Sequence, residues 1–397
     1  MNATQARAAR RHDVLIIGAG PAGLSLALSL APLGLRIGVL DCQEETSIAQ
    51  PADDGREIAL THKSMRILQS LGVAAGWSAD EVAPIRAARV YNGRSARFLD
   101  FQAGAAGSGP LGHLVANHCI RREIYRRIRE QPGIELLCGR RIRAWSTDAD
   151  QAAVHTETDG WLGADLLVAA DSRHSETRRA LGISARMHDF GKTMLVLRAS
   201  HGASHDGTAM EWFDFGRTIA TLPLCGRQSS IILTVSGAEA ERLLRQGEAA
   251  LEARLNRWLS PRLGPLQLVS AVHRYPLVAV YAERFVGRRF ALVGDAAVGM
   301  HPVTAHGFNF GLSGQSLLAA LIGGQSRAGR DIAADRVLAR YEHLHRRATW
   351  PLYQATNAVA RLYTSDTPPA RLARRIMLDL GERVAPFKRA IVRELRS

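Results

Sequence analysis

The sequence predicts an α/β protein in which a domain built on a parallel β-sheet carries an inserted antiparallel sheet and is followed by a helical C-terminal segment. Three observations support this prediction: a glycine-rich turn between two strand-like runs near the N-terminus, a series of closely spaced strand-like runs in the middle, and a second glycine-rich strand end late in the chain. A length of 397 residues favours more than one domain, and 46% apolar residues are ample for a core.

The first glycine-rich turn lies within VLIIGAGPAG (14–23). Its four leading apolar residues are typical of a buried strand, a helix-like stretch follows to about Leu33, and a second strand-like run (36–40) ends on Asp41. This strand–turn–helix–strand order is the context in which the pattern Gly-x-Gly-x-x-Gly binds a dinucleotide. The sequence therefore predicts a dinucleotide-binding turn.

The residues of this turn have separate expected tasks. Gly18 allows the tight turn, Gly20 lets a pyrophosphate approach the backbone, and Gly23 lets the helix pack on the strand. The pyrophosphate then lies at the helix N-terminus, where unpaired N–H groups and the helix dipole favour an anion. Asp41 is placed to accept hydrogen bonds from both ribose hydroxyls. We expect Gly18, Gly20, Ala22, Gly23 and Asp41 to bind the ADP half of the cofactor.

The second glycine-rich segment is GDAAVGMHPVTAHGFNFG (294–311), which follows the strand-like run 290–293. A segment so poor in large side chains suits a large polar ligand held by main-chain N–H groups. Asp295, at the carboxyl end of the strand, can accept hydrogen bonds from ligand hydroxyls, and 307–309 begins a helix-like stretch. Because the chain has one dinucleotide fingerprint near its start and this segment near its end, it fits a single long cofactor, FAD, stretched across the domain.

Strand-like runs recur between residues 193 and 275, namely MLVLRA, MEWFDF, TIATLPL, SSIILTV and LQLVSAVHRY. Such spacing indicates an antiparallel sheet, which a helical pattern over 239–259 interrupts. Asn92-Gly93, between two strand-like runs of 87–100, signals a hairpin. We therefore expect a discontinuous FAD-binding domain (1–84, 104–185 and 284–340), a substrate domain (85–103 and 186–283) and a C-terminal helical segment (341–397).

The net charge of +14 does not indicate a nucleic-acid partner. Of the 51 Lys and Arg residues only Lys63, Lys192 and Lys388 are lysines, and the arginines are scattered without an aromatic-interleaved basic motif. The four cysteines lie far apart, without the spacing of a zinc site or of a disulfide framework. Reduced thiols of this kind are typical of a cytoplasmic protein.

Two segments raise the question of a membrane. The uncharged run 14–35 follows several arginines and mimics a signal peptide, but its four glycines and two prolines argue against a spanning helix. The tail Arg371–Ser397 holds eight Arg/Lys against three Asp/Glu, interleaved with apolar residues. This tail is either a solvated helix face or a segment attracted to an anionic membrane surface.

Taken together, these segments resemble the class A FAD-dependent aromatic hydroxylases of the para-hydroxybenzoate hydroxylase fold, and more narrowly the ubiquinone-biosynthesis hydroxylases. The resemblance extends over nearly the whole chain. Its motifs are GAGPAG (18–23), DGREIALTHKSMRILQSLGV (54–73, the DGR segment), VAADSRHSETRRALGI (168–183, the DG motif), GDAAVGMHPVTAHGFNFG (294–311, the GD motif) and LYTSDTPPARLARRIM (362–377). The wording GMHPVTAHGFN looks closest to the branch that hydroxylates demethoxyubiquinol-type intermediates.

The resemblance implies non-covalent FAD and assigns further residues to it. Arg56 of the DGR segment reaches the flavin's phosphate and ribityl region, and Arg121 offers a polar side chain to the flavin from a helix. Asp171 belongs to the DG motif, in which Ser175 and Arg178 also match. Asp295 binds the ribityl hydroxyls.

The same resemblance places the start of the late helix at the flavin ring. The N–H groups of Gly307, Phe308 and Asn309 face the N1–C2 carbonyl edge, where the helix dipole stabilises the negative charge of reduced flavin. The chain departs from the family at Ser172, where the DG motif usually has glycine, and at His306, where the GD motif usually has glutamine.

Pro302 and His306 are the expected catalytic-site residues of the GD motif. Pro302 can end the loop, and a loop histidine near flavin, His306 or His301, can relay a phenolic proton because its pKa lies near working pH. A hydrogen-bonded structural histidine is the alternative. Since no third ligand has suitable spacing, the two histidines do not predict a metal site.

No second glycine fingerprint exists for NAD(P)H, and the resemblance implies that it binds transiently as electron donor. Oxygen then adds to reduced flavin, and the hydroperoxide transfers OH to a phenol held against the ring. The expected substrate is a prenylated phenol or quinone precursor, which the resemblance places in ubiquinone biosynthesis. A hydroxylase of small soluble phenols, a flavin-dependent reductase of isoprenoid chains and a non-catalytic flavin-binding scaffold are the alternatives.

In the resembled family the inserted sheet roofs the flavin, so Trp212, Phe213, Phe215 and Tyr275 are candidates to line the substrate pocket, with core packing as the alternative. The expected location is the cytoplasm. Peripheral attachment to the inner membrane, or to a ubiquinone-biosynthesis complex, is a further expectation because a prenylated phenol does not diffuse freely in water.

Overall fold

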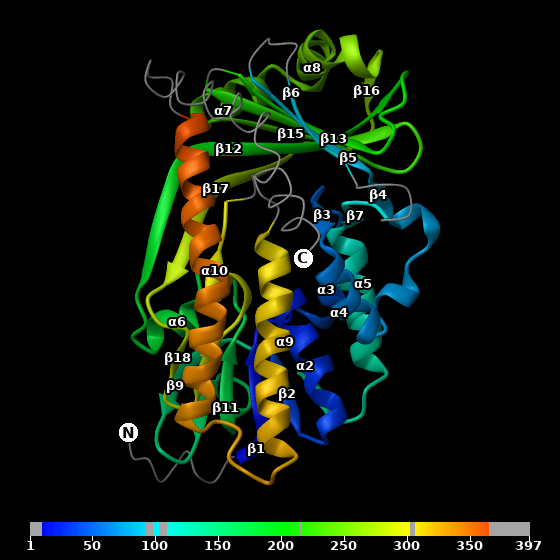
Figure 1. The fold of residues 1–397 in the computed structure, drawn as a ribbon. Coiled ribbons are helices and arrows are strands. Elements are labelled where there is room, and N and C mark those ends of the chain that lie inside the picture. Colours follow the sequence, from blue (N-terminus) through cyan, green and yellow to red (C-terminus); the bar gives the residue numbers. More distant parts are fainter. Residues whose placement is uncertain (1–9, 93–97, 103–108, 215, 302–305, 365–397) are drawn as a thin grey trace.

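The computed structural model describes residues 10–92, 98–102, 109–214, 216–301 and 306–364 (Figure 1). A mostly parallel sheet and a large mixed sheet form two separate layers, and the long helix α10 runs beside both of them. The predicted α/β architecture, with an inserted sheet and a C-terminal helix, is confirmed.

The parallel sheet is built around the two strand-like runs near the N-terminus. Its parallel strands lie in the order β19, β11, β1, β2 and β8. Val14, Leu15 and Val39 are completely buried, as expected for aliphatic strands covered on both faces. The strands of this sheet are β1 Arg10–Ile17, β2 Ile37–Leu40, β8 Ile134–Leu137, β11 Gly160–Ala169 and β19 Phe290–Leu292, with β9 Ile142–Thr147, β10 Ala152–Thr156 and β18 Val286–Gly287 added in antiparallel pairings.

Helices α2, α5 and α9 pack next to one another on this layer (Figure 1). Helix α2 starts with Pro21, whose missing N–H costs nothing at the first helical position, and its chain turns back at Gly34, which has φ +72°. The helices of this part are α2 Pro21–Leu30, α3 Glu45–Ala49, α4 His62–Ser70, α5 Asn117–Arg129, α6 Glu176–Ala180 and α9 Gly307–Ser326, with short 3₁₀ turns at Ala31–Leu33, Ala74–Gly76, Ala79–Glu81 and Gly294–Ala296.

The large mixed sheet lies above the parallel sheet in Figure 1, and α7 and α8 cover its outer face. Its strands follow the order β20, β17, β12, β15, β14, β13, β5 and β6, with β16 paired to β12. They are β5 Ala87–Asn92, β6 Phe98–Gln102, β12 Ala185–His201, β13 Thr208–Asp214, β14 Arg217–Pro223, β15 Gln228–Ser236, β16 Leu266–Leu268, β17 His273–Ala282 and β20 Val298–Gly299. A small antiparallel sheet, β3 Glu57–Leu60, β7 Gly112–Ala116 and β4 Ala83–Ile85, lies beneath it.

Two expectations for the inserted sheet have definite outcomes. The hairpin expected over 87–100 is confirmed, since β5 and β6 pair antiparallel, although its turn at 93–97 lies outside the described residues. The helical pattern over 239–259 belongs to two helices rather than one, α7 Gly237–Arg245 and α8 Glu248–Leu263. The break occurs at Gly247, whose φ of +83° is readily adopted only by glycine.

Helix α10 (Asp335–Thr364) begins before the expected start at residue 341 and bridges the two layers. Tyr341 Oη donates to the carbonyl of Leu292 in the parallel sheet at 2.7 Å, and the hydroxyls of Thr349 and of Tyr281 in the mixed sheet lie 3.1 Å apart. The basic tail Arg371–Ser397 and most of the segment 362–377 lie outside the described residues.

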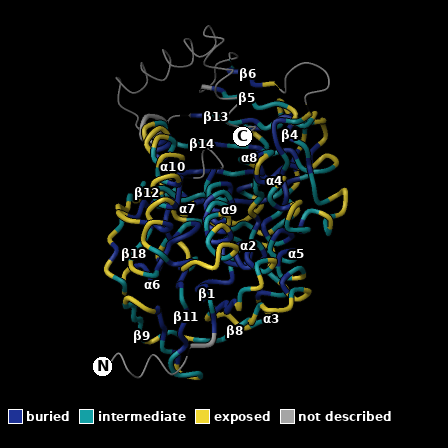
Figure 2. The backbone as a smooth tube through the Cα atoms, turned by 60° about the horizontal axis from the view of Figure 1, so that its bottom comes forward, coloured by how far each residue is buried: buried dark blue, intermediate teal, exposed yellow. Residues whose placement is uncertain are grey.

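Buried positions concentrate along the parallel sheet and the helices packed on it, while exposed positions recur along α10 (Figure 2). The uncharged run 14–35 forms the buried strand β1 and helix α2, followed by a 3₁₀ turn. Among the described residues, no helix combines the length and the apolar character needed to cross a membrane.

Candidate cofactor and active site

The glycine-rich turn between β1 and α2 is closely packed on one side and open on the other. A Cβ on Gly23 would lie 2.0 Å from the carbonyl oxygen of Gly18, and a Cβ on Gly18 would lie 2.5 Å from that of Ala170. In contrast, no heavy atom lies within 4 Å of a Cβ placed on Gly20. The backbone at Gly20 therefore faces open space at the N-terminus of α2, as the approach of a pyrophosphate requires.

Asp41 is held against this turn. One carboxylate oxygen accepts a hydrogen bond from the N–H of Ala19 at 2.7 Å, and the other accepts from the N–H of Gln43 at 2.8 Å. Since a carboxylate oxygen has two acceptor sites, each oxygen can accept a further bond from a ribose hydroxyl. The carboxylate is thus oriented before any ligand arrives.

Arg56 lies in the DGR segment, in a loop that side-chain hydrogen bonds hold in place. Arg56 Nη2 donates to Asp54 Oδ2 at 2.6 Å, and its guanidinium lies 5.5 Å from the centre of the Tyr275 ring. Tyr275 Oη in turn donates to the carbonyl of Asp54 at 2.6 Å, and Asn117 Nδ2 donates to Asp54 Oδ2 at 2.8 Å. Although burial opposes its charge, the Asp54 carboxylate raises the pKa of Arg56. Arg56 is a fixed cation with N–H groups left for an anionic ligand.

Arg121, on α5, is half-buried near the same place. Burial lowers the pKa of Arg121, and the nearest charges are those of Asp54, Arg56 and Asp41. Its guanidinium has no hydrogen bond or ion pair within the part of the chain that the structure describes. A desolvated guanidinium between Asp41 and the DGR segment is suited to a phosphate.

The DG and GD motifs brace each other at the far end of the site. Asp295, in the 3₁₀ turn after β19, accepts from Arg173 Nη2 at 2.9 Å. The fully buried Arg178 donates to the carbonyl of Ala296 at 2.9 Å and to that of Arg173 at 3.2 Å. Asp171 accepts from the N–H of Thr177 at 3.1 Å. These bonds fix the turn that carries Asp295.

Ser172 adopts φ +72°. This left-handed conformation is unusual for a residue other than glycine, and it explains why the resembled family has glycine at the position. The backbone shape of the motif is therefore retained in this chain despite the substitution.

Small residues let α2, the GD turn and α9 approach closely. A Cβ on Gly294, which has φ +61°, would lie 2.9 Å from the Cβ of Ala22, and a Cβ on Gly311 would lie 3.4 Å from the Cα of Gly294. The side chain of Ala22, expected to contact the cofactor, thus lies at this packing contact. The closeness brings the N-terminal ends of α2 and α9 to the same part of the molecule.

Helix α9 begins at Gly307, as predicted. The Asn309 side chain accepts from the N–H of Thr61 at 3.1 Å and donates to the carbonyl of Ala59 at 2.9 Å, so it ties the helix to the small sheet. The N–H groups of Gly307 and Phe308 have no acceptor within the helix, because they belong to its first turn. They can bind the carbonyl edge of a ring placed at the helix end.

The expected catalytic-site residues are only partly described. Pro302 lies outside the described residues. His306 is buried, precedes α9 and has its ring centre 5.9 Å from that of Phe310. His301 is also buried, and burial lowers its pKa to about 4, so it is neutral at pH 7. The described residues hold no cluster of three or more side chains suited to a metal ion.

One ion-pair network was not predicted. Arg198, which projects from β12 of the mixed sheet, donates to Asp53 Oδ2 at 2.6 Å and to Glu57 Oε1 at 2.8 Å. Burial raises the pKa of Glu57, although the positive charge of Arg198 and its hydrogen bond to the carboxylate lower it in part. The Arg198 side chain is only 18% exposed and that of Glu57 4%, so this pair is a largely desolvated link between the mixed sheet and the small sheet, while Asp53 is 42% exposed.

The aromatic side chains proposed for the substrate pocket separate onto different faces. Trp212 stacks on Tyr91 with ring centres 5.2 Å apart, on the face that α8 covers, so its assignment to the pocket is wrong. Tyr275 contacts the DGR segment, Phe213 is buried, and Phe215 lies outside the described residues. Alternation along β13 explains the difference between Trp212 and Phe213.

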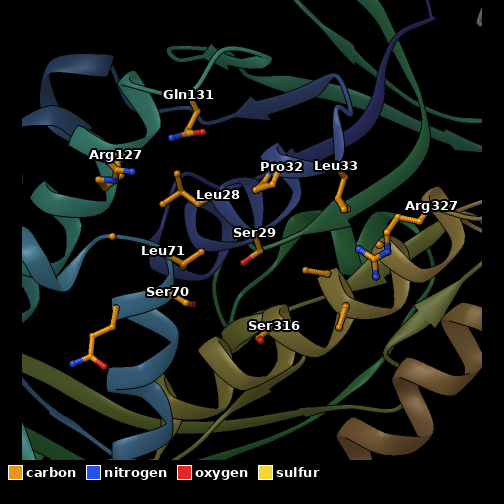
Figure 3. Close-up of a pocket in the computed structure, with 15 residues that line it drawn as sticks. Leu28, Ser29, Pro32, Leu33, Ser70, Leu71, Arg127, Gln131, Ser316 and Arg327 are labelled. Carbon is orange, nitrogen blue, oxygen red and sulfur yellow. The ribbon is translucent and has the colours of Figure 1, made fainter.

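A groove of about 540 Å³ lies at the C-terminal ends of α2 and α9, away from the glycine-rich turn (Figure 3). Arg127 and Arg327 lie on opposite sides of it, with Ser29, Pro32 and Ser316 between them. None of the predicted cofactor-binding residues lines this groove. The groove is therefore separate from the cofactor site that the sequence predicts.

The arrangement fits FAD along the carboxyl ends of the parallel strands. The turn after β1 and Asp41 after β2 suit the ADP half, while Asp295 after β19 lies at the same edge because β1, β11 and β19 run parallel. Arg56 lies close enough to Asp295 for the two charges to interact. A single extended dinucleotide can reach all of these groups.

Comparisons with known proteins agree with this geometry. A family described as FAD binding domain matches residues 11–356. The chain is 43% identical over 387 residues to ubiquinone hydroxylase UbiM of Neisseria meningitidis, covering 96% of this chain and 84% of that protein. It is 35% identical over 383 residues to ubiquinone hydroxylase UbiL of Rhodospirillum rubrum, covering 96% and 88%.

Solved structures show the same fold. The p-nitrophenol 4-monooxygenase PnpA of Pseudomonas putida superimposes with a TM-score of 0.79 at 18% identity, covering 98% of this chain and 99% of that one. PqsL of Pseudomonas aeruginosa superimposes with a TM-score of 0.74 at 23% identity, covering 91% and 98%. By its matched domain and its ubiquinone hydroxylase relatives, the chain belongs to the FAD-binding-domain family of FAD-dependent aromatic-ring monooxygenases.

Proposed function

We propose that this enzyme hydroxylates the aromatic ring of a prenylated phenol in ubiquinone biosynthesis, with FAD as bound cofactor and NAD(P)H and O₂ as co-substrates. The observation that carries the proposal is the meeting of the glycine-rich turn, Arg56 and Asp295 along one sheet edge in a chain whose relatives are named ubiquinone hydroxylases. Bound FAD would supply the chemistry of electron transfer from NAD(P)H and of O₂ activation. The protein binds and orients both reactants and excludes water.

The roles of the cofactor-binding residues follow from where each lies. Gly20 and the N-terminus of α2 receive the pyrophosphate, and Asp41 the ribose. Arg56 and Arg121 bind phosphate or ribityl oxygens through charge-assisted hydrogen bonds, and Asp295 accepts from ribityl hydroxyls. The first N–H groups of α9 would receive the carbonyl edge of the flavin ring, and the helix dipole would favour a negatively charged, reduced ring there.

The FAD-binding domain and the substrate domain have different functions. Residues 1–84, 104–185 and 284–340 hold FAD, and 85–103 and 186–283 cover the ring and hold the phenol. The strands of the large mixed sheet, drawn mainly from 87–102 and 185–282, support this division. In the active site, His306 relays the phenolic proton, and the family resemblance assigns Pro302 to the same site.

A prenylated phenol must be collected from a membrane or from a lipid-carrying protein. We place the enzyme in the cytoplasm with its basic tail, Arg371–Ser397, at the surface of an anionic leaflet, where each cation contributes about 1 kcal/mol. The tail contains eight Arg or Lys residues and only three Asp or Glu residues, and this positive charge supports binding to an anionic membrane surface.

Deletion of the gene followed by mass-spectrometric profiling of extracted quinones tests the proposal. We expect accumulation of an under-hydroxylated, prenylated intermediate and its disappearance on complementation with the intact chain. An unchanged profile would contradict the proposal and favour a hydroxylase of small soluble phenols. Complementation with a chain whose tail arginines are replaced by glutamine isolates membrane docking, because normal function of that chain would remove the docking role and leave the chemistry.

A further inference from the structure

A carboxylate on β13, Glu211, faces the cofactor side of the large mixed sheet. Side chains alternate between the two faces of a strand. Its neighbours Met210 and Trp212 pack beneath α8, together with Leu255 and Leu259. Glu211 therefore projects from the opposite, inner face.

The inner face of β13 lies toward the small sheet and the start of α9. Ala209, two residues before Glu211 and on the same face, packs against the cluster that contains Leu114 of the small sheet, and Ala59 of that sheet packs against the same cluster. The carbonyl of Ala59 also accepts a hydrogen bond from Asn309 in the first turn of α9. Figure 1 shows the N-terminal end of α9 pointing toward the mixed sheet. Glu211 thus lies on the face that looks toward the expected position of the flavin ring.

The surroundings of Glu211 are apolar and accessible. Strand register places Val90 on one side of it and Ala220 on the other, with Ile232 next in the row, and all four side chains are half-buried. The residues behind them on the outer face are tightly packed, as shown by exposures of 1% for Tyr91, 5% for Ile219 and 0% for Ile231 and Leu233. The row thus retains accessible surface only on its inner side.

The carboxylate of Glu211 has no partner of its own. Within the described residues it makes no hydrogen bond or ion pair, and the register neighbours carry no polar side chain. Burial raises the pKa of Glu211 to about 8. An ionisable group in apolar surroundings without a partner destabilises the folded protein unless a ligand forms a hydrogen bond with it.

We propose that Glu211 binds the ring hydroxyl of the substrate by accepting its O–H hydrogen bond, while Val90, Ala220 and Ile232 contact the apolar part of the ring. This inference rests on the proposed function, since it takes the ligand to be a phenol. The bond orients the ring beneath the mixed sheet. Above about pH 8, where Glu211 is ionised, the bond also draws the O–H proton toward the carboxylate, which increases electron density at the ring carbons that receive oxygen.

The test compares a short-chain prenylated phenol with its methyl ether, which cannot donate a hydrogen bond. Both ligands are titrated into the FAD-loaded enzyme at about pH 9, where Glu211 is ionised, and the change in flavin absorbance reports the dissociation constant. The wild type should bind the phenol about tenfold or more tightly than the ether. Glu211→Leu should remove most of this preference by weakening the phenol alone, and Glu248→Leu, at an exposed position on α8, should leave it unchanged.

A role limited to folding gives a different result. If Glu211→Leu weakens the binding of both ligands equally, or changes the binding of neither, Glu211 does not recognise the hydroxyl and the inference is overturned. Glu211→Gln, which keeps the size of the side chain, is the second variant. If both variants keep the preference for the phenol and hydroxylate it as the wild type does, the inference is also overturned. If the wild type binds neither ligand, the proposed phenol substrate fails as well, which separates the two failures.

Discussion

Gly20→Ala should weaken FAD binding while leaving the stability of the apo-protein unchanged, whereas Gly23→Ala should reduce both. Gly20 has φ −77° and ψ 175°, which alanine adopts without strain, and no heavy atom lies within 4 Å of the added Cβ. The methyl group would occupy the space through which the pyrophosphate approaches the backbone. We expect the affinity for FAD to fall by about 100-fold, equivalent to about 2.7 kcal/mol.

Gly23 differs because its Cβ would lie 2.0 Å from the carbonyl oxygen of Gly18 and 3.2 Å from the Cβ of Ala170. These are atoms of the turn and of the loop after β11, so β1 and α2 must separate to relieve the overlap. We expect a loss of about 3 kcal/mol in the free energy of unfolding of the apo-protein. Urea unfolding of both apo-variants and FAD titration decide the matter. Equal loss of apo-protein stability in the two variants would contradict the account of an open Gly20 and a packed Gly23.

Arg56→Ala and Asp295→Ala should each weaken FAD binding by about 10- to 100-fold, since each removes a charge-assisted hydrogen bond worth about 1.5–3 kcal/mol. Arg56 is held by Asp54 and Tyr275 before the ligand binds, so little order is lost on binding. Both affinities are measured by titrating the apo-proteins with FAD, with Arg66→Ala as a control at an exposed arginine of the neighbouring helix.

A second comparison separates Asp295 from its partner. Asp295→Ala also removes the carboxylate that accepts from Arg173, whereas Asp295→Asn retains an acceptor oxygen there. The asparagine variant should therefore bind FAD more tightly than the alanine variant. Unchanged affinity in both Arg56→Ala and Asp295→Ala would mean that the phosphate and ribityl groups lie elsewhere.

Sequence patterns sufficed for the parts of the fold that depend on neighbours along the chain. The turn 18–23, the strand at 290–292 and the helix starting at Gly307 follow from local rules of glycine use and apolar runs. The break at Gly247 was missed because helical periodicity continues on both sides of it, and this periodicity does not reveal the positive φ that separates the two helices.

Features that depend on contacts between distant strands could not be predicted. The link from Arg198 to Asp53 and Glu57, and the bond from Arg173 to Asp295, join segments more than 100 residues apart. The faces of Trp212 and Glu211 follow from which side of β13 α8 covers, and the sequence alone does not specify that side. A charged residue between the apolar neighbours Met210 and Trp212 in MEWFDF was the available signal for Glu211.

The central claim is that this chain uses FAD to place an oxygen atom from O₂ on the ring of a prenylated phenol. The most direct measurement is mass spectrometry of the product formed by the FAD-loaded enzyme with NAD(P)H, a short-chain prenylated phenol and oxygen-18 gas. The account predicts a hydroxylated ring carrying a single oxygen-18 atom, and no such product without FAD. Consumption of NAD(P)H without a labelled product, or a product whose new oxygen comes from water, would contradict it.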